Sequence, residues 1–312
     1  MRFLRTSLLT ISCLLMAASN VGAQQFTRLI ECTSPSPSVY CIWLEPEISP
    51  DGGWIAFTSG STWPPYYEWW PSVAIVSTDG NSSIPVMNVS LSGWAFNPSW
   101  SPNGTRLAFV ADGFGAEETG IWIVDLADPQ NMESYELLPN TAGAYALAWS
   151  RDGRSIAYVA SGGIWVADVG SGAASLVIPG GYDPSWAANG AIVFVQSNDL
   201  WIREANGSVR QLTNTPWKET TPAWSPAGTW IAFAADQHGS WDIWVIASTG
   251  GSAVRVTSQV ADELQPSWSG DSKSILYHSY LQNDEFWLAT NLPDFTVSIA
   301  QRSWSQVKQL FK

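Results

Sequence analysis

The chain is poor in the residues on which most catalytic and metal sites depend. Its 312 residues include 3 cysteines and 2 histidines, and only 13% of them are charged. Phosphate-cradling glycine loops and zinc-ligand spacings are absent, and so is the Gly-x-Ser-x-Gly elbow of serine hydrolases. We therefore expect a protein with no catalytic residue, no bound metal and no cofactor.

Basic residues are also scarce, with 14 Lys and Arg against 27 Asp and Glu and a net charge of −13. Nucleic acid is an unfavourable partner for so acidic a chain. Beyond the N-terminus, no apolar run approaches the 18 residues of a membrane-spanning helix. The composition thus excludes nucleic-acid binding and a transmembrane segment in the mature chain, and we expect a monomer.

The N-terminal 23 residues are typical of a secretory signal peptide. Arg2 and Arg5 precede an apolar run from Leu8 to Ala18, and Val21-Gly22-Ala23 offers a small-residue cleavage site. We expect export to the periplasm or beyond, and loss of Arg2 and Arg5 would leave 12 basic residues against 27 acidic ones, a net charge of −15. Lipidation at Cys13 is the alternative, but the leucine expected three residues earlier is missing.

Cleavage would leave only two cysteines, Cys32 and Cys41, separated by a turn-rich segment. In an exported protein such an even pair predicts one disulfide. Two reduced thiols are the alternative.

A sequence repeat is what the chain does have. Pro222-Ala223-Trp224-Ser225-Pro226-Ala227-Gly228 is the clearest copy, and we call its Trp224 the anchor position. The other anchors are Ile48, Trp100, Trp149, Trp186 and Trp268. They lie 37 to 52 residues apart, and a spacing of this size indicates repeated supersecondary units.

Each repeat reads as four antiparallel strands. Ser-Pro-x-Gly favours a type I turn, an apolar strand such as Ile231-Ala232-Phe233 follows, and a third strand such as Ile243-Trp244-Val245 comes after a variable loop. Four strands in about 40 residues is the pattern of a propeller blade. The sequence therefore predicts an all-β, six-bladed β-propeller.

Prolines two residues before the anchor support this arrangement. Proline cannot donate to a sheet ladder, so it belongs on an edge strand, and the innermost strand of a blade is an edge that faces the central channel. The prolines in question are Pro46, Pro98, Pro184, Pro222 and Pro266.

The repeat Pro-x-Trp-Ser-Pro-x-Gly-x-x-Ile-Ala-Phe, followed by Asp-Ile-Trp-Val, resembles the repeat of the TolB-like propeller family. The resemblance covers residues from about 44 to about 300. It implies the propeller fold and an envelope protein as partner, such as the lipoprotein Pal that TolB binds. The α/β domain that precedes the propeller in TolB has no counterpart here, and no contact residue carries over because the loops share no motif.

We divide the chain into a signal peptide (1–23), an N-terminal segment with the disulfide (24–43), the propeller (44–300) and a C-terminal tail (301–312). Phe26-Thr27-Arg28-Leu29-Ile30 is similar to the fourth strands of the repeat. We expect it to pair in the last blade and close the ring. Alternatively, residues 296–299 fill that outer position.

Half of the 20 tryptophans recur at two repeat positions and are explained by packing. The exceptions gather in variable loops on one face, where aromatic side chains with a polar end can anchor a partner or stack on a ligand. The candidate partner-binding residues are Trp63, Tyr66, Tyr67, Trp69, Trp70, Phe114 and Trp241. The alternative is that the loop at 60–71 folds onto the disc and covers the first blade.

Other chemistry is less well supported. His238 and His278 lie in or beside the variable loops and are interpreted as ordinary loop residues rather than metal ligands with Glu117, Gln237 or Asp284. Loop carboxylates could form the pair that glycoside hydrolysis needs, but nothing singles out two of them. Asp199, Asp242 and Glu285 recur too regularly to be catalytic and are expected to make strand-end hydrogen bonds.

These observations favour a non-catalytic binding platform of the cell envelope with a protein partner on its loop-rich face. A glycan-binding or glycan-cleaving propeller that uses the same aromatic loops is the alternative. A structural relative that has lost such partners is a third possibility.

Overall fold

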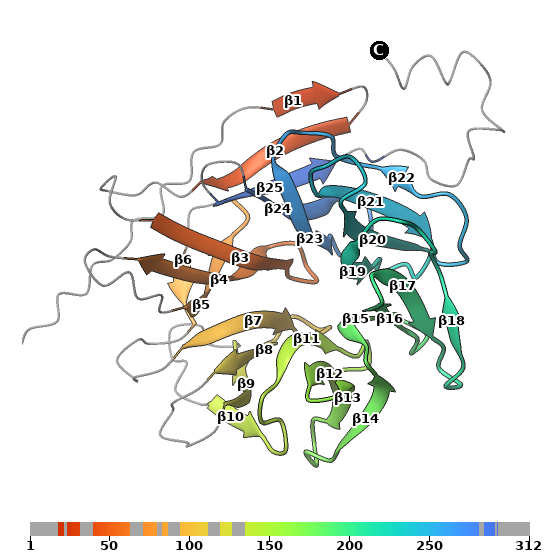
Figure 1. Cartoon of the computed structure of the whole chain (residues 1–312). Helices are drawn as coiled ribbons and strands as arrows, with labels where there is room; N and C mark the ends of the chain where they lie inside the picture. The colour runs from red at the N-terminus through yellow and green to blue at the C-terminus, as the bar shows by residue number, and fades with distance from the viewer. Residues whose placement is uncertain are drawn as a thin grey trace, which may run out of the picture.

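A computed structural model of the chain describes residues 18–21, 24–31, 40–62, 71–79, 83–86, 94–111, 119–126, 135–280, 284–290 and 292. These residues form six sheets around a central axis (Figure 1). In this part of the chain, no helix is long and apolar enough to cross a membrane. The predicted all-β, six-bladed propeller is confirmed.

Five blades are four-stranded antiparallel sheets of consecutive strands. Blade 1 holds β3 (Tyr40–Ile48), β4 (Trp54–Thr62), β5 (Ser72–Ser77) and β6 (Ser83–Pro85). Blade 2 holds β7 (Ala95–Trp100), β8 (Arg106–Ala111), β9 (Gly120–Asp125) and β10 (Tyr135–Leu138). Blade 3 holds β11 (Tyr145–Trp149), β12 (Ser155–Ala160), β13 (Gly163–Asp168) and β14 (Ala174–Pro179). Blade 4 holds β15 (Tyr182–Trp186), β16 (Ile192–Gln196), β17 (Asp199–Arg203) and β18 (Val209–Gln211). Blade 5 holds β19 (Glu219–Trp224), β20 (Trp230–Ala235), β21 (Asp242–Ala247) and β22 (Val254–Arg255).

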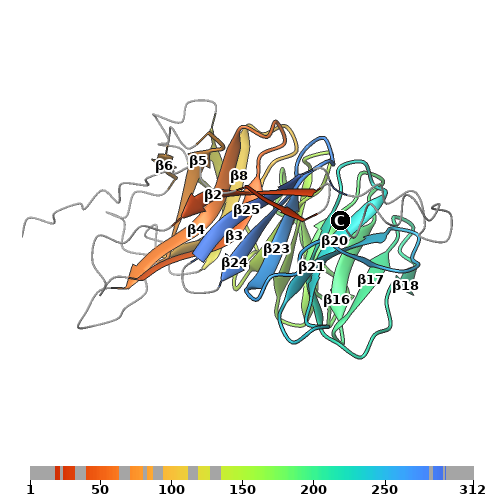
Figure 2. The same ribbon diagram turned by 90° about the horizontal axis from the view of Figure 1, so that it is seen from above.

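Blade 6 joins the two ends of the chain. It contains β23 (Asp262–Trp268), β24 (Ile275–Tyr280) and β25 (Asp284–Thr290), followed in the sheet by β2 (Gln24–Glu31) and β1 (Ala18–Val21). Strand β2 runs antiparallel beside β25, with Arg28 opposite Trp287 (Figure 2). The prediction that residues 26–30 close the ring in the last blade is confirmed. Strand β1 lies within the predicted signal peptide.

Each inner strand ends in the turn that the repeat predicts. In the first repeat the Gly52 N–H donates to the Ser49 carbonyl (2.8 Å), and the Ser49 hydroxyl accepts from the Trp54 N–H (2.9 Å). The Asp51 carboxylate accepts the Gly53 N–H (3.0 Å). The turns that begin at Ser101, Ser150, Ser225 and Ser269 repeat the first of these bonds. Serine recurs in the repeat because its hydroxyl satisfies the N–H that starts the second strand.

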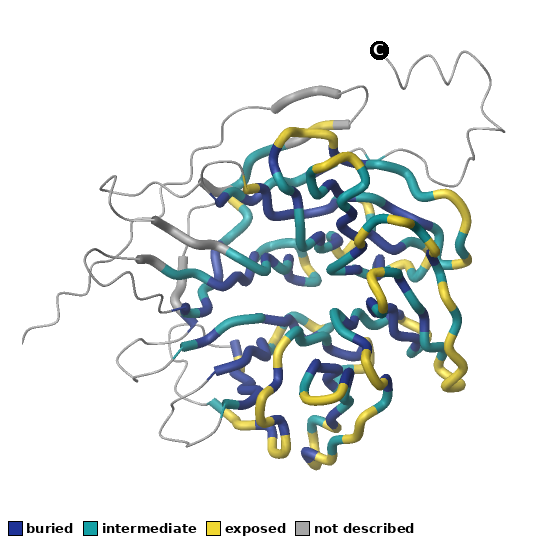
Figure 3. Tube along the Cα trace, in the orientation of Figure 1, coloured by how far each residue is buried: buried dark blue, intermediate teal, exposed yellow. Residues whose placement is uncertain are grey.

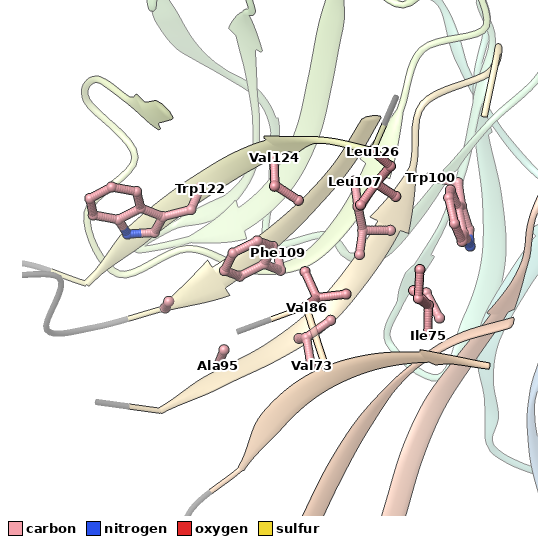
Figure 4. Close-up of a cluster of buried hydrophobic side chains, with 12 residues drawn as sticks. Val73, Ile75, Val86, Ala95, Trp100, Leu107, Phe109, Trp122, Val124 and Leu126 are labelled. Carbon is pink, nitrogen blue, oxygen red and sulfur yellow. The ribbon is translucent and has the colours of Figure 1, made fainter. Parts of the chain in front are cut away.

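The cores lie between neighbouring blades. Between blades 1 and 2, Val73 and Ile75 of β5 pack with Leu107 and Phe109 of β8 and with Trp122 of β9 (Figure 4). Burial is most complete in the second strand of each blade, the inner strands are mostly half-buried, and the exposed stretches are turns and outer hairpins (Figure 3). Because each blade needs its neighbours to bury its two faces, the closed ring is the unit of stability.

The anchor tryptophans link consecutive blades. Trp100, Trp149 and Trp268 are buried, and their indole N–H groups donate to main-chain carbonyls of the preceding blade at 3.1, 3.1 and 3.0 Å. Those acceptors, Glu47, Ser99 and Ala223, stand one residue before the preceding anchor. The recurrence of tryptophan is thus structural, as the sequence predicted.

Candidate functional site

The inner strands of all six blades line a cavity of about 320 Å³ in the central channel. Two sets of residues form its wall. The first ring stands three residues before each anchor and consists of Glu45, Asn97, Ala146, Asp183, Thr221 and Gln265. The second ring stands one residue before each anchor, nearer the turns, and consists of Glu47, Ser99, Ala148, Ser185, Ala223 and Ser267.

Every first-ring residue has a left-handed backbone, with φ between 47° and 58°. Each sits in a β-bulge, where the register between inner and second strand shifts by one residue. The bulge leaves its extra residue unpaired with the second strand. The first-ring N–H therefore faces the channel instead of the ladder.

Side chains of the first ring accept these N–H groups from the next blade. The Gln265 side chain accepts from Glu45 N–H (2.8 Å), and the Glu45 carboxylate from Asn97 N–H (2.7 Å). The Asn97 side chain accepts from Ala146 N–H (3.1 Å). The Asp183 carboxylate accepts from Thr221 N–H (3.1 Å), and the Thr221 hydroxyl from Gln265 N–H (3.3 Å). Five of the six links around the channel are therefore closed.

The sixth link is open between blades 3 and 4. Ala146 has no acceptor atom, so within the described residues the Asp183 N–H lacks the side-chain partner that its five equivalents have. The indole nitrogens of Trp186 and Trp224 are buried with no partner among the described residues, whereas the other three anchor tryptophans bond to the preceding blade. The junction between blades 3 and 4 therefore lacks both the first-ring bond and the anchor bond, and the junction between blades 4 and 5 lacks only the anchor bond.

Negative charge dominates the channel. Glu45 and Asp183 belong to blades 1 and 4, which stand opposite each other in the ring. Burial raises the pKa of Glu45, and the charge of Asp183 raises it further, while hydrogen bonds from Thr58 and Asn97 oppose the shift. Because the carboxylates of Glu45 and Asp183 repel each other across the channel, a positively charged group between them is favoured.

Glu47 is the one ionisable member of the second ring. Burial raises its pKa to about 8, against hydrogen bonds from Trp100 and Ser99 and the positive charge of Arg151. Arg151 occupies the turn position at which the repeat around Trp224 has Pro226. The channel therefore has an acidic wall at blade 1 and a cationic residue at the turn of blade 3.

Two further carboxylates lie buried between blades, at one repeat position. Glu219 accepts hydrogen bonds from Thr213, from Thr215 (3.0 Å) and from the Leu200 N–H (3.2 Å). Glu263 is fully buried, and neither of its oxygens has a hydrogen-bond partner in good geometry among the described residues. Burial raises the pKa of Glu263 to about 7, and nearby Asp242 adds to the shift, while Thr257 and Arg255 oppose it.

The structure corrects the placement of His278. This residue lies inside β24, 3% exposed, and its Nε2 is 2.6 Å from the Asp284 carboxylate at the start of β25. The strand continues two residues past His278, so that residue is not part of a loop. His238, by contrast, is exposed beside Trp244 as a turn residue. Among the described residues, no three His, Cys, Asp or Glu side chains gather in a group able to hold a metal ion.

The regularly spaced carboxylates make the expected strand-end bonds. Asp199 accepts from the Thr215 N–H (3.0 Å), Asp242 from Arg255 (2.7 Å) and Glu285 from Arg28 (2.9 Å). These pairs fix the outer edges of blades 4, 5 and 6. Their role is structural.

Most of the predicted partner-binding residues lie outside the described residues. They are Trp63, Tyr66, Tyr67, Trp69, Trp70 and Phe114. Trp241 is described, and its half-buried side chain packs against the core between blades 5 and 6. Its N–H donates to Asp262 (3.0 Å) and its carbonyl accepts from the Glu263 N–H (2.8 Å). Cys32 also lies outside the described residues, while the Cys41 backbone stands opposite Ser61 in blade 1, so the disulfide stays a prediction.

Sequence reasoning assigned the inner strands to the scaffold and missed the polar ring. A signal was present, because the residue before the repeated proline is polar in all five repeats that contain this proline. An ordinary edge strand would not need a polar residue at this position in each repeat. The bulge that directs these residues along the channel wall becomes visible only in the folded blade.

Similarity to known proteins agrees with this architecture. The family model for the Tricorn protease N-terminal beta propeller domain matches residues 184–302, which begin in blade 4. The structure of TolB from Acinetobacter baumannii superposes with a TM-score of 0.59 and 16% identity, over 82% of this chain and 80% of TolB. The fold is that of a TolB-like propeller.

Other propellers superpose on this TolB-like propeller nearly as well. Oligogalacturonate lyase in complex with manganese has a TM-score of 0.55 and 14% identity, over 91% of this chain and 97% of the lyase. The β-propeller domain of the Trilobed protease from Pyrococcus furiosus has a TM-score of 0.55 and 12% identity, over 85% of this chain and all of that domain. At such identities the likeness concerns the fold alone.

One curated relative shares part of the sequence. The uncharacterized peptidase YuxL of Bacillus subtilis (strain 168) is 31% identical over an alignment of 113 residues, and the match covers 30% of this chain. The matched region is 16% of the length of YuxL. The match therefore concerns one segment of each chain, and the peptidase activity named for YuxL does not transfer with it.

Proposed function

We propose that the chain is an exported, non-catalytic binding platform of the cell envelope that takes a basic segment of a protein partner into its central channel. The observation that carries this proposal is the acidic wall formed by Glu45, Glu47 and Asp183 around one cavity. A lysine or arginine side chain placed there relieves the repulsion between the two first-ring carboxylates. The net charge of −13 steers basic partners towards the disc.

A periplasmic location and a Pal-like lipoprotein as partner extend the same proposal. They are supported by the signal peptide predicted at 1–23 and by the TolB-like repeat. The loop residues Trp63, Tyr66, Tyr67, Trp69, Trp70, Phe114 and Trp241 provide a second contact area on the loop-rich face in this proposal. The non-catalytic role is supported by the position of His278, which is buried in blade 6 and bonded through its Nε2 to the Asp284 carboxylate.

The test is calorimetric titration of the full chain with the peptide acetyl-Ala-Lys-Ala-Lys-Ala-amide at low ionic strength. The control is a peptide of the same length and opposite charge, with glutamate in place of lysine. We expect the basic peptide alone to bind, and we expect the double variant Glu45→Gln, Asp183→Asn to lose at least tenfold in affinity, because each carboxylate then loses its charge. Equal binding of both peptides, or no binding of the basic one, contradicts the proposal.

Glycan binding is the second candidate, favoured by a cavity of about 370 Å³ between blades 4 and 5. Trp217 and Trp244 stand in its wall together with Asn214, Thr215 and Gln237. Aromatic faces beside amide and hydroxyl groups are suited to sugar rings. In the same titration, binding of a neutral trisaccharide that the Trp217→Ala variant abolishes would favour this candidate over the protein partner.

A further inference from the structure

Inner strand β11 is the one inner strand without a proline and without a polar first-ring side chain. The repeated proline is replaced by Leu147, the first-ring position holds Ala146 and the second-ring position Ala148. All three line the channel cavity. In blade 3 the backbone along the channel thus carries two alanines and a leucine, where the neighbouring blades carry proline and polar side chains.

The missing proline changes the hydrogen-bonding capacity of the edge. In β11, Tyr145 is opposite Val159 and Ala148 opposite Ala157, so Ala146 and Leu147 together face a single residue of β12. A bulge leaves its extra residue unpaired with the neighbouring strand. The Ala146 N–H is taken by Asn97, whereas Leu147, which lines the channel cavity, keeps the N–H that proline lacks in the other blades.

A second donor lies on the adjacent inner strand. The Asp183 N–H of β15 faces the space that a longer side chain at position 146 would fill. Prolines at edges prevent unwanted strand pairing, so the five prolines block five of the six inner edges. Two main-chain donors beside two alanines therefore make β11 the inner edge that is open to another strand.

We propose that β11 is a pairing edge for an extended segment of the partner, whose main-chain carbonyl oxygens accept hydrogen bonds from the N–H groups of Leu147 and Asp183. This rests on the proposed function and assigns the basic segment a place and a conformation. Strand addition supplies affinity through main-chain bonds. Specificity comes from Glu45 and Asp183, whose carboxylates complement lysine or arginine side chains of the segment, and from Glu47, whose carboxyl group can hydrogen-bond to them.

The test compares Leu147→Pro with Leu147→Ala, using the lysine peptide defined above. Leu147→Pro removes the N–H, and blades 1, 2, 4, 5 and 6 already hold proline at this bulge position. Leu147→Ala removes the same side chain but keeps the N–H. We expect Leu147→Pro to weaken binding at least tenfold and Leu147→Ala to stay within about threefold of the wild type.

Amide exchange provides a measurement that does not depend on the folding of a variant. In wild-type protein we expect the peptide to slow exchange at Leu147 and Asp183 at least tenfold and to leave the Ala146 amide unchanged, since Asn97 already holds it. If the peptide binds but both Leu147 variants bind equally and neither amide is protected, edge pairing is wrong and the acidic platform stands. If the peptide does not bind the wild type, both proposals are wrong.

Discussion

Two buried glutamates at one repeat position have different surroundings in neighbouring blades. Glu219 is held by Thr213, by Thr215 and by the Leu200 N–H. Glu263 has no such partners in good geometry among the described residues. The Tyr277 hydroxyl is buried and also lacks a partner there, and burial raises its pKa, with the nearby Glu263 adding to the shift. A buried carboxylate without donors is stable only when it keeps its proton.

Stability should therefore fall with rising pH because of Glu263. The pKa of Glu263 is about 7 in the folded state and 4.5 in the unfolded state. Between these two pH values the folded state therefore keeps a proton that the unfolded state has released. The loss begins near pH 4.5, grows up to about pH 7 and then levels off. We expect Glu263→Gln to gain about 3 kcal/mol over the wild type between pH 4 and pH 8, measured by urea unfolding.

The control is Glu219→Gln, which should destabilise at neutral pH because an amide cannot accept three donors as a carboxylate does. The groups that face Glu263 are Asp242, Arg255, Thr257 and Tyr277. Unfolding curves of wild type and Glu263→Gln that run parallel across this pH range would show that the carboxylate is not the cause.

At the scale of the strand, β11 shows how one element can weaken a repeated junction. The other junctions of the first ring each have a side chain that accepts the next first-ring N–H, as Asn97 accepts from Ala146. Ala146 also adopts φ 50°, a conformation that costs alanine more than it costs asparagine. Blade 3 therefore carries both an open link and local strain.

Ala146→Asn should close the ring of hydrogen bonds. The asparagine carbonyl can reach the Asp183 N–H as its equivalents do, and asparagine tolerates the left-handed backbone. We expect about 1 kcal/mol of added stability and a rise in Tm of about 2 °C, measured by thermal unfolding. Asp183 amide exchange should slow in parallel.

Ala146→Val provides the matched comparison, because a β-branched residue fills space but offers no acceptor and is strained at positive φ. It should lower the Tm. An Ala146→Asn variant no more stable than the wild type, with an unprotected Asp183 amide, would mean that water already satisfies this link.

At the scale of the whole molecule, β2 determines whether the ring is closed. It covers the outer edge of β25 through a ladder from Gln25 to Glu31, and Arg28 pairs with Glu285 at 2.9 Å. The partly buried Leu29 packs against the core between blades 6 and 1. An uncovered edge is a template for pairing with another chain.

A chain shortened to begin at residue 40 should therefore lose stability and self-associate. We expect a Tm lower by several degrees and oligomers in size-exclusion chromatography with light scattering, because β25 then offers an unpaired edge. A chain that begins at Gln24, which retains β2, serves as the control and should stay monomeric. A monomeric, equally stable chain from residue 40 would show that β2 is dispensable for closure.

The sequence by itself determined the repeat, and with it the fold. The turn serines, the anchor tryptophans and the prolines of the inner edge are local signals that recur in each unit, so strand order, blade number and the closing role of residues 26–30 followed from them. Local chemistry suffices there because each blade repeats one short-range pattern.

The tertiary structure alone decided what the channel is. Glu45 and Glu47 lie far from Asp183 in the chain, and they converge with it only when six blades close. The open link at Ala146 is likewise invisible until Asp183 of the next blade stands beside it. His278 was misplaced for a related reason, because its burial depends on pairing with Asp284 across a hairpin. Sequence patterns specify elements, whereas contacts between blades depend on closure of the ring.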